Sequence, residues 1–72
     1  MKKFVLYIET IDENTSDIIF RKLEDVCYAD SIDDCLEQTD WENYDVESNE
    51  QICIEEMDNE GFVAEEYYPL YS

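Results

Sequence analysis

The chain has 72 residues, which suits one small domain, and its 21 Asp and Glu against 4 Lys and Arg, with no His, give a formal net charge of −17. This charge excludes direct binding to nucleic-acid phosphates and to an anionic membrane surface. No apolar run reaches the roughly 18 residues of a transmembrane helix, and the short run after Met1 lacks a cleavage site, so we expect a cytoplasmic protein. Leu, Ile, Val and Phe make up a quarter of the residues, which favours one folded acidic α+β domain over residues 1–72 rather than a disordered chain.

The first predicted element is a strand over residues 2–10. Phe4, Leu6 and Ile8 alternate with a second set of residues that also contains apolar side chains, which is typical of a central strand. A polar turn over residues 12–16 follows, and its Asn, Thr and Ser residues are favourable helix N-caps.

The turn is therefore predicted to lead into a helix over residues 16–28. Arg21 is spaced for i,i+4 ion pairs with Asp17 and Asp25, and Lys22 lies three residues before Asp25. We expect these local carboxylates to hold two of the four basic residues. The apolar stripe of this helix consists of Ile19, Phe20, Leu23, Val26 and Cys27.

A second, shorter helix is predicted over residues 30–38. Ser31 is its expected N-cap, and Ile32, Cys35 and Leu36 form its buried stripe. The opposite face carries carboxylates at i, i+3, i+4 and i+7, within about 100° of the helical wheel.

Three further strands are predicted over residues 43–48, 51–57 and 62–68. The last two are joined by a turn that places Gly61 at positive φ, and Pro69 ends the final strand. The predicted order is β-α-α-β-β-β. This order indicates a small antiparallel sheet of about four strands with one or two helices packed on one face.

Residue types needed for catalysis or for a structural metal are scarce. The chain has no His, one Gly and three cysteines, Cys27, Cys35 and Cys53, which form no CxxC pair. The acidic stretch over residues 40–47 lacks the Gly and the final Glu of a calcium-binding loop. We expect no enzyme activity, no cofactor and no dedicated metal site, and three buried, unpaired cysteines in a reducing compartment.

The charge is distributed unevenly along the sequence. Residues 1–22 contain all four basic residues and four acids, whereas residues 23–72 contain 17 acids and no base. A solvated acidic face serves solubility, for which a net charge of about 2–8 suffices in a small domain. The excess favours a surface that binds a basic partner.

Aromatic residues next to the acids are candidate anchors for that partner. Trp41 and Tyr44 lie within the acidic stretch, and Tyr67, Tyr68 and Tyr71 lie near the C-terminus. For Trp41 the alternative is a core or lid position over the short helix, and for the terminal tyrosines it is packing at the sheet edge. The predicted partner-binding residues are Asp30, Asp33, Asp34, Glu37, Asp40, Trp41, Glu42, Tyr44, Asp45, Glu47, Glu55, Glu56, Glu65 and Glu66.

In size, charge and the layout of these residues the chain resembles small acidic inhibitors from phages and mobile elements that mimic nucleic acid. That class includes anti-CRISPR proteins, anti-restriction proteins and uracil-DNA glycosylase inhibitors. The resemblance implies a non-catalytic inhibitor, monomeric or dimeric, that occupies the DNA- or RNA-binding groove of a host defence enzyme, with a CRISPR–Cas effector favoured as the target.

Two alternatives stay open. The first is an acidic module that masks a basic protein, as an antitoxin does; such a module need not lose its partner to competing nucleic acid. The second is a small structural protein that assembles through a sheet edge at residues 62–68.

Overall fold

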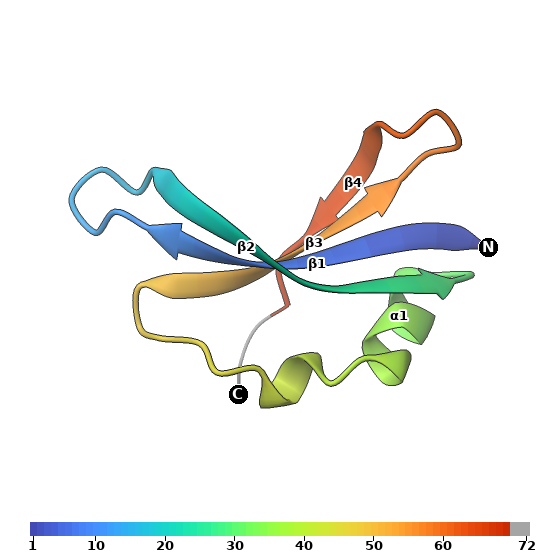
Figure 1. Cartoon of the computed structure of the whole chain (residues 1–72), viewed down its shortest axis with the longest axis horizontal. Coiled ribbons are helices and arrows are strands. Elements are labelled where there is room, and N and C mark those ends of the chain that lie inside the picture. Colours follow the sequence, from blue (N-terminus) through green and yellow to red (C-terminus); the bar gives the residue numbers. More distant parts are fainter. Residues whose placement is uncertain (70–72) are drawn as a thin grey trace.

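A computed structural model of the chain describes residues 1–69. The described elements are strands β1 (Lys2–Ile11) and β2 (Ile18–Ala29), helix α1 (Ile32–Gln38), the 3₁₀ turn η1 (Trp41–Asn43), and strands β3 (Glu50–Met57) and β4 (Val63–Tyr67) (Figure 1). The strands form an antiparallel sheet in the order β2-β1-β3-β4. The predicted α+β class with a four-stranded antiparallel sheet is confirmed, whereas the predicted order of elements is not.

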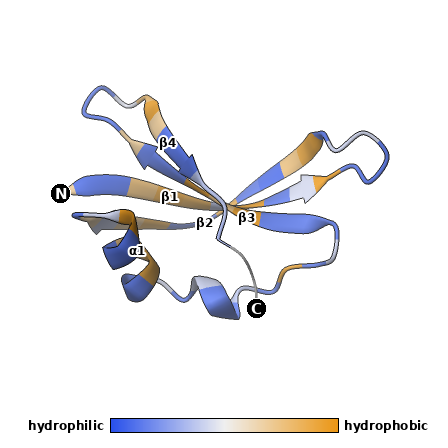
Figure 2. Ribbon diagram, turned by 180° about the vertical axis from the view of Figure 1, so that it is seen from behind, coloured by the Kyte–Doolittle hydropathy of each residue, from blue (hydrophilic) through white to orange (hydrophobic). Residues whose placement is uncertain are grey.

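Strand β1 is central, as predicted from the apolar residues on both of its faces. It pairs with β2 on one side and with β3 on the other. Phe4 and Leu6 are fully buried, and Val5 and Ile8 are nearly so. In Figure 2 the middle of β1 is correspondingly hydrophobic. With a partner strand on each side, β1 contributes more buried apolar residues than any other described element.

The helix predicted over residues 16–28 is wrong, because this segment forms the 12-residue strand β2. The ion pairs predicted for Arg21 and Lys22, with Asp17 and Asp25, are also absent from the described contacts. Arg21 contacts Glu9 and Glu55 on other strands, and Lys22 contacts Glu24. Periodicity alone fitted a helix, but β-branched and aromatic residues at both ends of the segment favour a strand, and pairing with β1 decides the outcome.

The polar residues expected to cap that helix close a β-hairpin instead. Asp12 Oδ1 accepts from the Asn14 N–H at 2.8 Å, and the Asp12 N–H donates to the Asp17 carbonyl at 2.8 Å. Ser16 adopts φ 64°, in the left-handed region. Asn, Asp, Ser and Thr favour turns for the same reason that they favour N-caps, which explains the wrong prediction.

Helix α1 begins and ends close to its predicted limits. Ser31 is the N-cap and its Oγ accepts from the Asp34 N–H at 3.2 Å. Thr39 closes the other end by donating from its N–H and its Oγ1 to the Cys35 carbonyl, at 3.2 and 2.9 Å. The strand predicted over residues 43–48 is wrong: η1 ends at Asn43, and the following residues form an irregular connection to β3.

The C-terminal hairpin agrees with the prediction. Strands β3 and β4 pair through a turn in which Gly61 has φ 90°. Asp58 closes this turn, because its Oδ1 accepts from the N–H groups of Glu60 and Phe62 at 2.9 Å each.

Helix α1 and η1 cover one face of the sheet, and the core lies between them and the strands (Figure 1). In Figure 2, α1 has a hydrophobic and a hydrophilic side. Among the described residues the opposite face has no covering element.

No helix within residues 1–69 is long and apolar enough to cross a membrane. The core consists of Phe4, Leu6, Cys27, Ala29, Cys35, Ile52 and Ile54, with Ile32, Leu36, Trp41, Tyr44, Val46 and Tyr67 packed against it.

Candidate functional site

The strongest concentration of unpaired acidic side chains lies on α1, η1 and the connection to β3. This acidic segment comprises residues 30–47, and eight of its 18 residues are Asp or Glu. Asp34 is partly buried. The exposed carboxylates belong to Asp30, Asp33, Glu37, Asp40, Glu42, Asp45 and Glu47.

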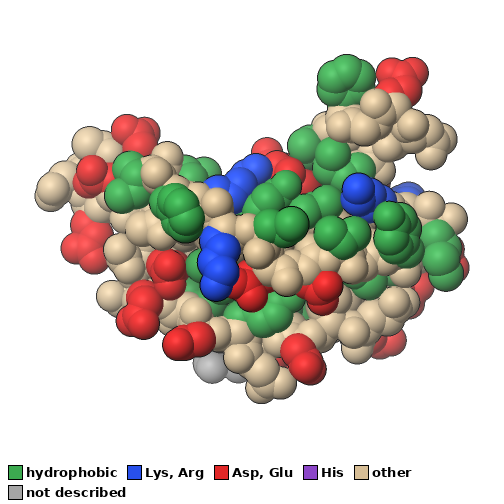
Figure 3. Space-filling view, viewed as in Figure 1, with side chains coloured by type: hydrophobic (Ala, Val, Ile, Leu, Met, Phe, Trp, Pro, Cys, Tyr) green, Lys and Arg blue, Asp and Glu red, His purple; other side chains and the backbone are tan. Residues whose placement is uncertain are grey.

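The acidic segment runs along the long axis of the molecule, on the side away from the sheet (Figure 1). The Cα atoms extend 38 Å along that axis. Figure 3 shows Asp and Glu side chains spread along this border. One turn of a DNA duplex is about 34 Å, so the whole molecule, of which the acidic segment occupies part, is about as long as one duplex turn.

The acidic charges of this segment are not neutralised by the protein itself. All four basic residues lie within residues 1–22. In the part of the chain that the structure describes, the ion pairs engage Glu9, Glu24, Glu55, Glu56 and Glu66, and none engages an acid of residues 30–47. The segment therefore presents its full negative charge to solvent or to a partner.

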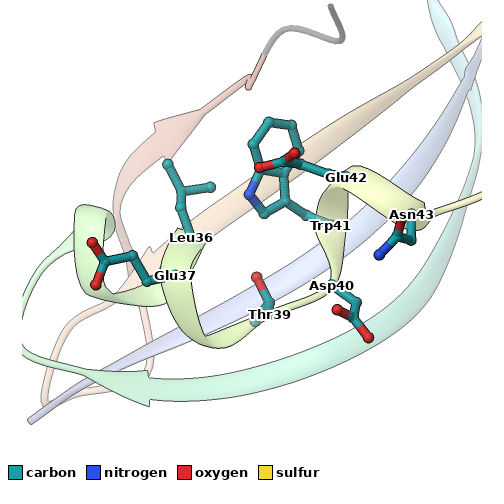
Figure 4. Close-up of a pocket in the computed structure, with 7 residues that line it drawn as sticks. All are labelled: Leu36, Glu37, Thr39, Asp40, Trp41, Glu42 and Asn43. Atoms are coloured by element: carbon teal, nitrogen blue, oxygen red, sulfur yellow. The ribbon is translucent and has the colours of Figure 1, made fainter.

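A shallow depression of about 410 Å³ lies in the middle of the acidic segment (Figure 4). Leu36 and Trp41 pack against the core, and in the close-up their side chains lie on the other side of the backbone from Asp40. Glu37 and Glu42 lie at the rim. The depression thus combines a partly exposed indole with three carboxylates, an arrangement that suits an Arg or Lys side chain.

The two aromatic residues predicted as anchors are only partly accessible. Trp41 is partly buried and packs against the core, as the lid alternative expected. Tyr44 also packs against the core, and its hydroxyl oxygen is buried. Burial raises the pKa of Tyr44 to about 12, and nearby Asp25 and Glu24 add to the shift. Trp41 can still contact a partner through the depression, whereas Tyr44 contributes mainly to the core.

The four predicted carboxylates on β3 and β4 lie on two faces of the sheet and do not join the acidic segment in one patch. Glu55 is buried and pairs with Arg21, so it is not available to a partner. Glu66 lies opposite it on β4, near Arg21. Glu56 is partly buried and lies 3.7 Å from the Lys2 ammonium, while Glu65 is exposed.

An ion-pair cluster at the centre of the open face was not predicted. Arg21 Nε donates to Glu9 Oε2 at 2.9 Å, and its Nη1 donates to Glu55 Oε2 at 3.0 Å. Glu9 is fully buried, and its second oxygen accepts from Gln51 Nε2 at 2.9 Å. The guanidinium carbon lies 4.3 Å from the centre of the Tyr7 ring. Hydrogen bonds to the two carboxylates, Glu9 first, raise the pKa of Arg21 further above its ordinary value.

This cluster could have been found from the sequence only through the register of the first hairpin. Glu9 and Arg21 are paired across β1 and β2. Once residues 18–29 are taken as a strand that folds back on residues 2–11, a charge pair near the end of the hairpin follows from cross-strand pairing. The helix prediction concealed this signal.

The three cysteines are free and buried, as predicted. Burial is the first cause that raises the pKa of Cys35 and of Cys53, each to about 12. Within residues 1–69 no group of three or more Cys, Asp or Glu side chains is arranged to hold a metal ion.

The C-terminal tyrosines were also predicted as possible anchors. Tyr67 packs on the core and Tyr68 is exposed, while Tyr71 lies outside the described residues.

Comparison of the chain with protein-family models, curated proteins and solved structures finds no match.

Proposed function

We propose that this protein is a non-catalytic inhibitor that occupies the nucleic-acid-binding groove of an enzyme by presenting the acidic segment in place of phosphates. The observation that carries the proposal is the row of exposed carboxylates over residues 30–47, which no basic residue of the described chain neutralises. Basic side chains that bind phosphates also bind carboxylates through the same forked hydrogen bonds.

The charge density of the segment supports this proposal. The whole molecule carries one net charge per about 300 Å² of its 5029 Å² surface. If surface is shared in proportion to chain length, the acidic segment carries one carboxylate per about 160 Å², which approaches the roughly 110 Å² per charge of duplex DNA. A groove built for a duplex therefore meets a comparable density of negative charge.

Hydrophobic contact is expected to add to the electrostatic attraction. The acidic segment has fewer charges than a bound duplex, so it releases fewer counterions. Trp41 in its depression offers a partly desolvated aromatic anchor among the acids. The resemblance in size and charge described above makes a CRISPR–Cas effector in the host cytoplasm the first target to examine.

The experiment is capture from bacterial lysate on the immobilised protein, elution with a salt gradient and identification by mass spectrometry. We expect a nucleic-acid-processing enzyme that is released by salt and by competing duplex DNA or RNA. A partner that ignores competing nucleic acid would contradict the proposal and favour the masking module.

Two charge-reversal variants test whether the location of the charge matters. The first is the triple variant Glu37→Lys, Asp40→Lys, Glu42→Lys within the acidic segment. The control is the triple variant Glu13→Lys, Asp17→Lys, Glu60→Lys, which changes exposed residues near the two hairpin turns by the same total charge. We expect the first variant to weaken target binding about tenfold or more, and the control to bind nearly as the parent protein does. Equal losses would show that net charge, and not the acidic segment, governs binding.

A further inference from the structure

The outer edge of β2 carries an unusual number of exposed apolar side chains. Strand β2 lies at the edge of the sheet, and on its outer side no strand within residues 1–69 pairs with it. Figure 3 shows hydrophobic side chains along this side of the molecule, with Lys and Arg between them. Natural proteins seldom leave a long apolar edge strand uncovered, because it is a template for another strand. The exposed residues are Ile18, Ile19, Phe20, Leu23, Val26 and Tyr28, with exposed fractions of 38 to 63%.

When two copies of β2 run antiparallel, the order of charges along one strand complements that along the other. From its start the strand runs through three apolar residues, the basic pair Arg21 and Lys22, then Leu23, then the acidic pair Glu24 and Asp25, and then three further apolar or cysteine residues. In an antiparallel pair related by a two-fold axis, the half of one strand that carries the basic residues lies beside the half of the other that carries the acidic residues.

The side chains also fit this arrangement face by face. Lys22 and Asp25 both point to the face covered by α1, since they pair with Ile8 and Leu6 of β1, and the extra residue between those pairs is Glu24. In an antiparallel pair, residues that lie opposite each other point to the same face of the sheet. Lys22 of each copy can therefore lie opposite Asp25 of the other, and the two-fold axis gives two such contacts. In the same register Arg21 lies opposite Val26 on the open side.

Both charged groups are accessible for this contact. The Lys22 side chain is 66% exposed, and its ammonium lies 3.0 Å from Glu24 of the same strand. Asp25 uses Oδ1 to accept from the Val26 N–H at 2.8 Å, which leaves its second oxygen for a partner.

We propose that β2 is a homodimerisation edge, at which a second copy of this chain adds its own β2 antiparallel and extends the sheet. The inference is independent of the inhibitor proposal, because it concerns the pairing edge of β2 and not the carboxylates of the acidic segment. Strand β4 at the other edge is unsuited to this role: it has five residues, and Glu65 and Glu66 near its centre would face like charges in a self-pair. This differs from the assembly edge over residues 62–68 that the sequence suggested.

The net charge of −17 per copy predicts an unusual salt response. Two such molecules repel at long range, and added salt screens this repulsion while leaving apolar contacts in place. We expect dimerisation to strengthen as NaCl is raised.

Sedimentation velocity over a concentration series tests the dimer directly. We expect a species of twice 8.6 kDa at high concentration, and a monomer at every concentration and salt level would overturn the proposal. Lys22→Asp and Asp25→Lys each place like charges opposite each other, so each variant alone should dimerise about tenfold more weakly or worse.

Mixing the two variants tests the register itself. In a heterodimer of Lys22→Asp with Asp25→Lys, both cross-strand contacts join opposite charges again, so the mixture should recover the association that each variant loses. Lys3→Asp on β1 and Glu60→Lys in the β3–β4 turn serve as controls with the same charge changes outside β2, and far-UV circular dichroism verifies that all variants fold. Failure of the mixture to associate, or equal losses in the controls, would overturn this interface.

Discussion

The two hairpins of the sheet differ sharply in charge. The β1–β2 hairpin contains all four basic residues of the chain, while the β3–β4 hairpin contains acids and no base. Arg21 connects them, because it extends from β2 to Glu9 on β1 and to Glu55 on β3. The buried acid of the second hairpin is thus neutralised by a base of the first. One arginine thereby links the pairing of strands that lie far apart in the sequence.

The largest effect is expected when this coupling is removed. Arg21→Met leaves the fully buried Glu9 with Gln51 as its remaining described hydrogen-bond partner, so the free energy of unfolding should fall by about 3 kcal/mol. Urea denaturation at neutral pH measures the loss. Adding Glu9→Gln to Arg21→Met should restore part of the stability, because the buried charge is then absent.

Lys22 provides the matched control on the same strand. Its ammonium is solvent-exposed and pairs with Glu24 at the surface, so Lys22→Met should change stability little. If Arg21→Met and Lys22→Met were equally mild, Arg21 would not couple the two hairpins.

A smaller effect is expected from alkaline pH, which acts on β3 and α1 rather than on the first hairpin. Burial raises the pKa of Cys53 and of Cys35 from 9.0 to about 12. The unfolded chain loses these thiol protons near pH 9, while the folded chain keeps them until about pH 12. The folded state therefore binds more protons in this window, and stability falls as pH rises through it.

Urea denaturation at a series of pH values from neutral to alkaline measures this slope. Below pH 9 neither thiol contributes to it, because both states are protonated there. Cys53→Ala should reduce the slope above pH 9, whatever its effect on stability at neutral pH. An unchanged slope would show that the Cys53 thiol is not protected by burial.

The smallest effects are expected at the two hairpin turns, which solve the same backbone problem differently. Ser16 holds φ 64° with an L side chain, whereas Gly61 holds φ 90° without one. Ser16→Gly should raise the free energy of unfolding by up to about 1 kcal/mol, and Gly61→Ala should lower it by about 1 kcal/mol.

Thermal or chemical denaturation of the two single variants compares them directly. A Cβ at Gly61 meets no atom within 4 Å, so the stability lost in Gly61→Ala reports backbone strain alone. A destabilised Ser16→Gly variant would indicate that the Ser16 side chain contributes more than its backbone strain costs.

Local signals predicted the elements whose limits depend on neighbouring residues. The cap at Ser31, the turn at Gly61 and the alternation in β1 and β3 each follow from chemistry within a few residues. The segment over residues 18–29 was not predictable in this way, because its apolar residues fit a helical stripe as well as an edge strand. What decides between them is pairing with β1 and the contact of Arg21 with Glu9, which lie outside any local window.

In the candidate site, too, features set by nearby residues were predictable and features set by distant contacts were not. Exposure of the acids on α1, η1 and the following connection could be expected from their spacing, since charged side chains on a surface element keep their hydration. The burial of Glu55 could not, because it depends on an arginine 34 residues earlier in the chain. Tyr44 was also misjudged as an anchor, since its burial depends on how the connection between η1 and β3 packs on the sheet.

By itself the sequence determined the size, the excess of negative charge, the concentration of that charge after residue 22, and the central place of β1. The tertiary structure alone decided that β2 is a strand, which carboxylates are buried beside Arg21, and which apolar side chains are left exposed at the sheet edge. The physical reason is that charge and local propensity belong to single residues and their neighbours. Burial and ion pairing belong instead to contacts between distant segments, which exist only after the strands have paired.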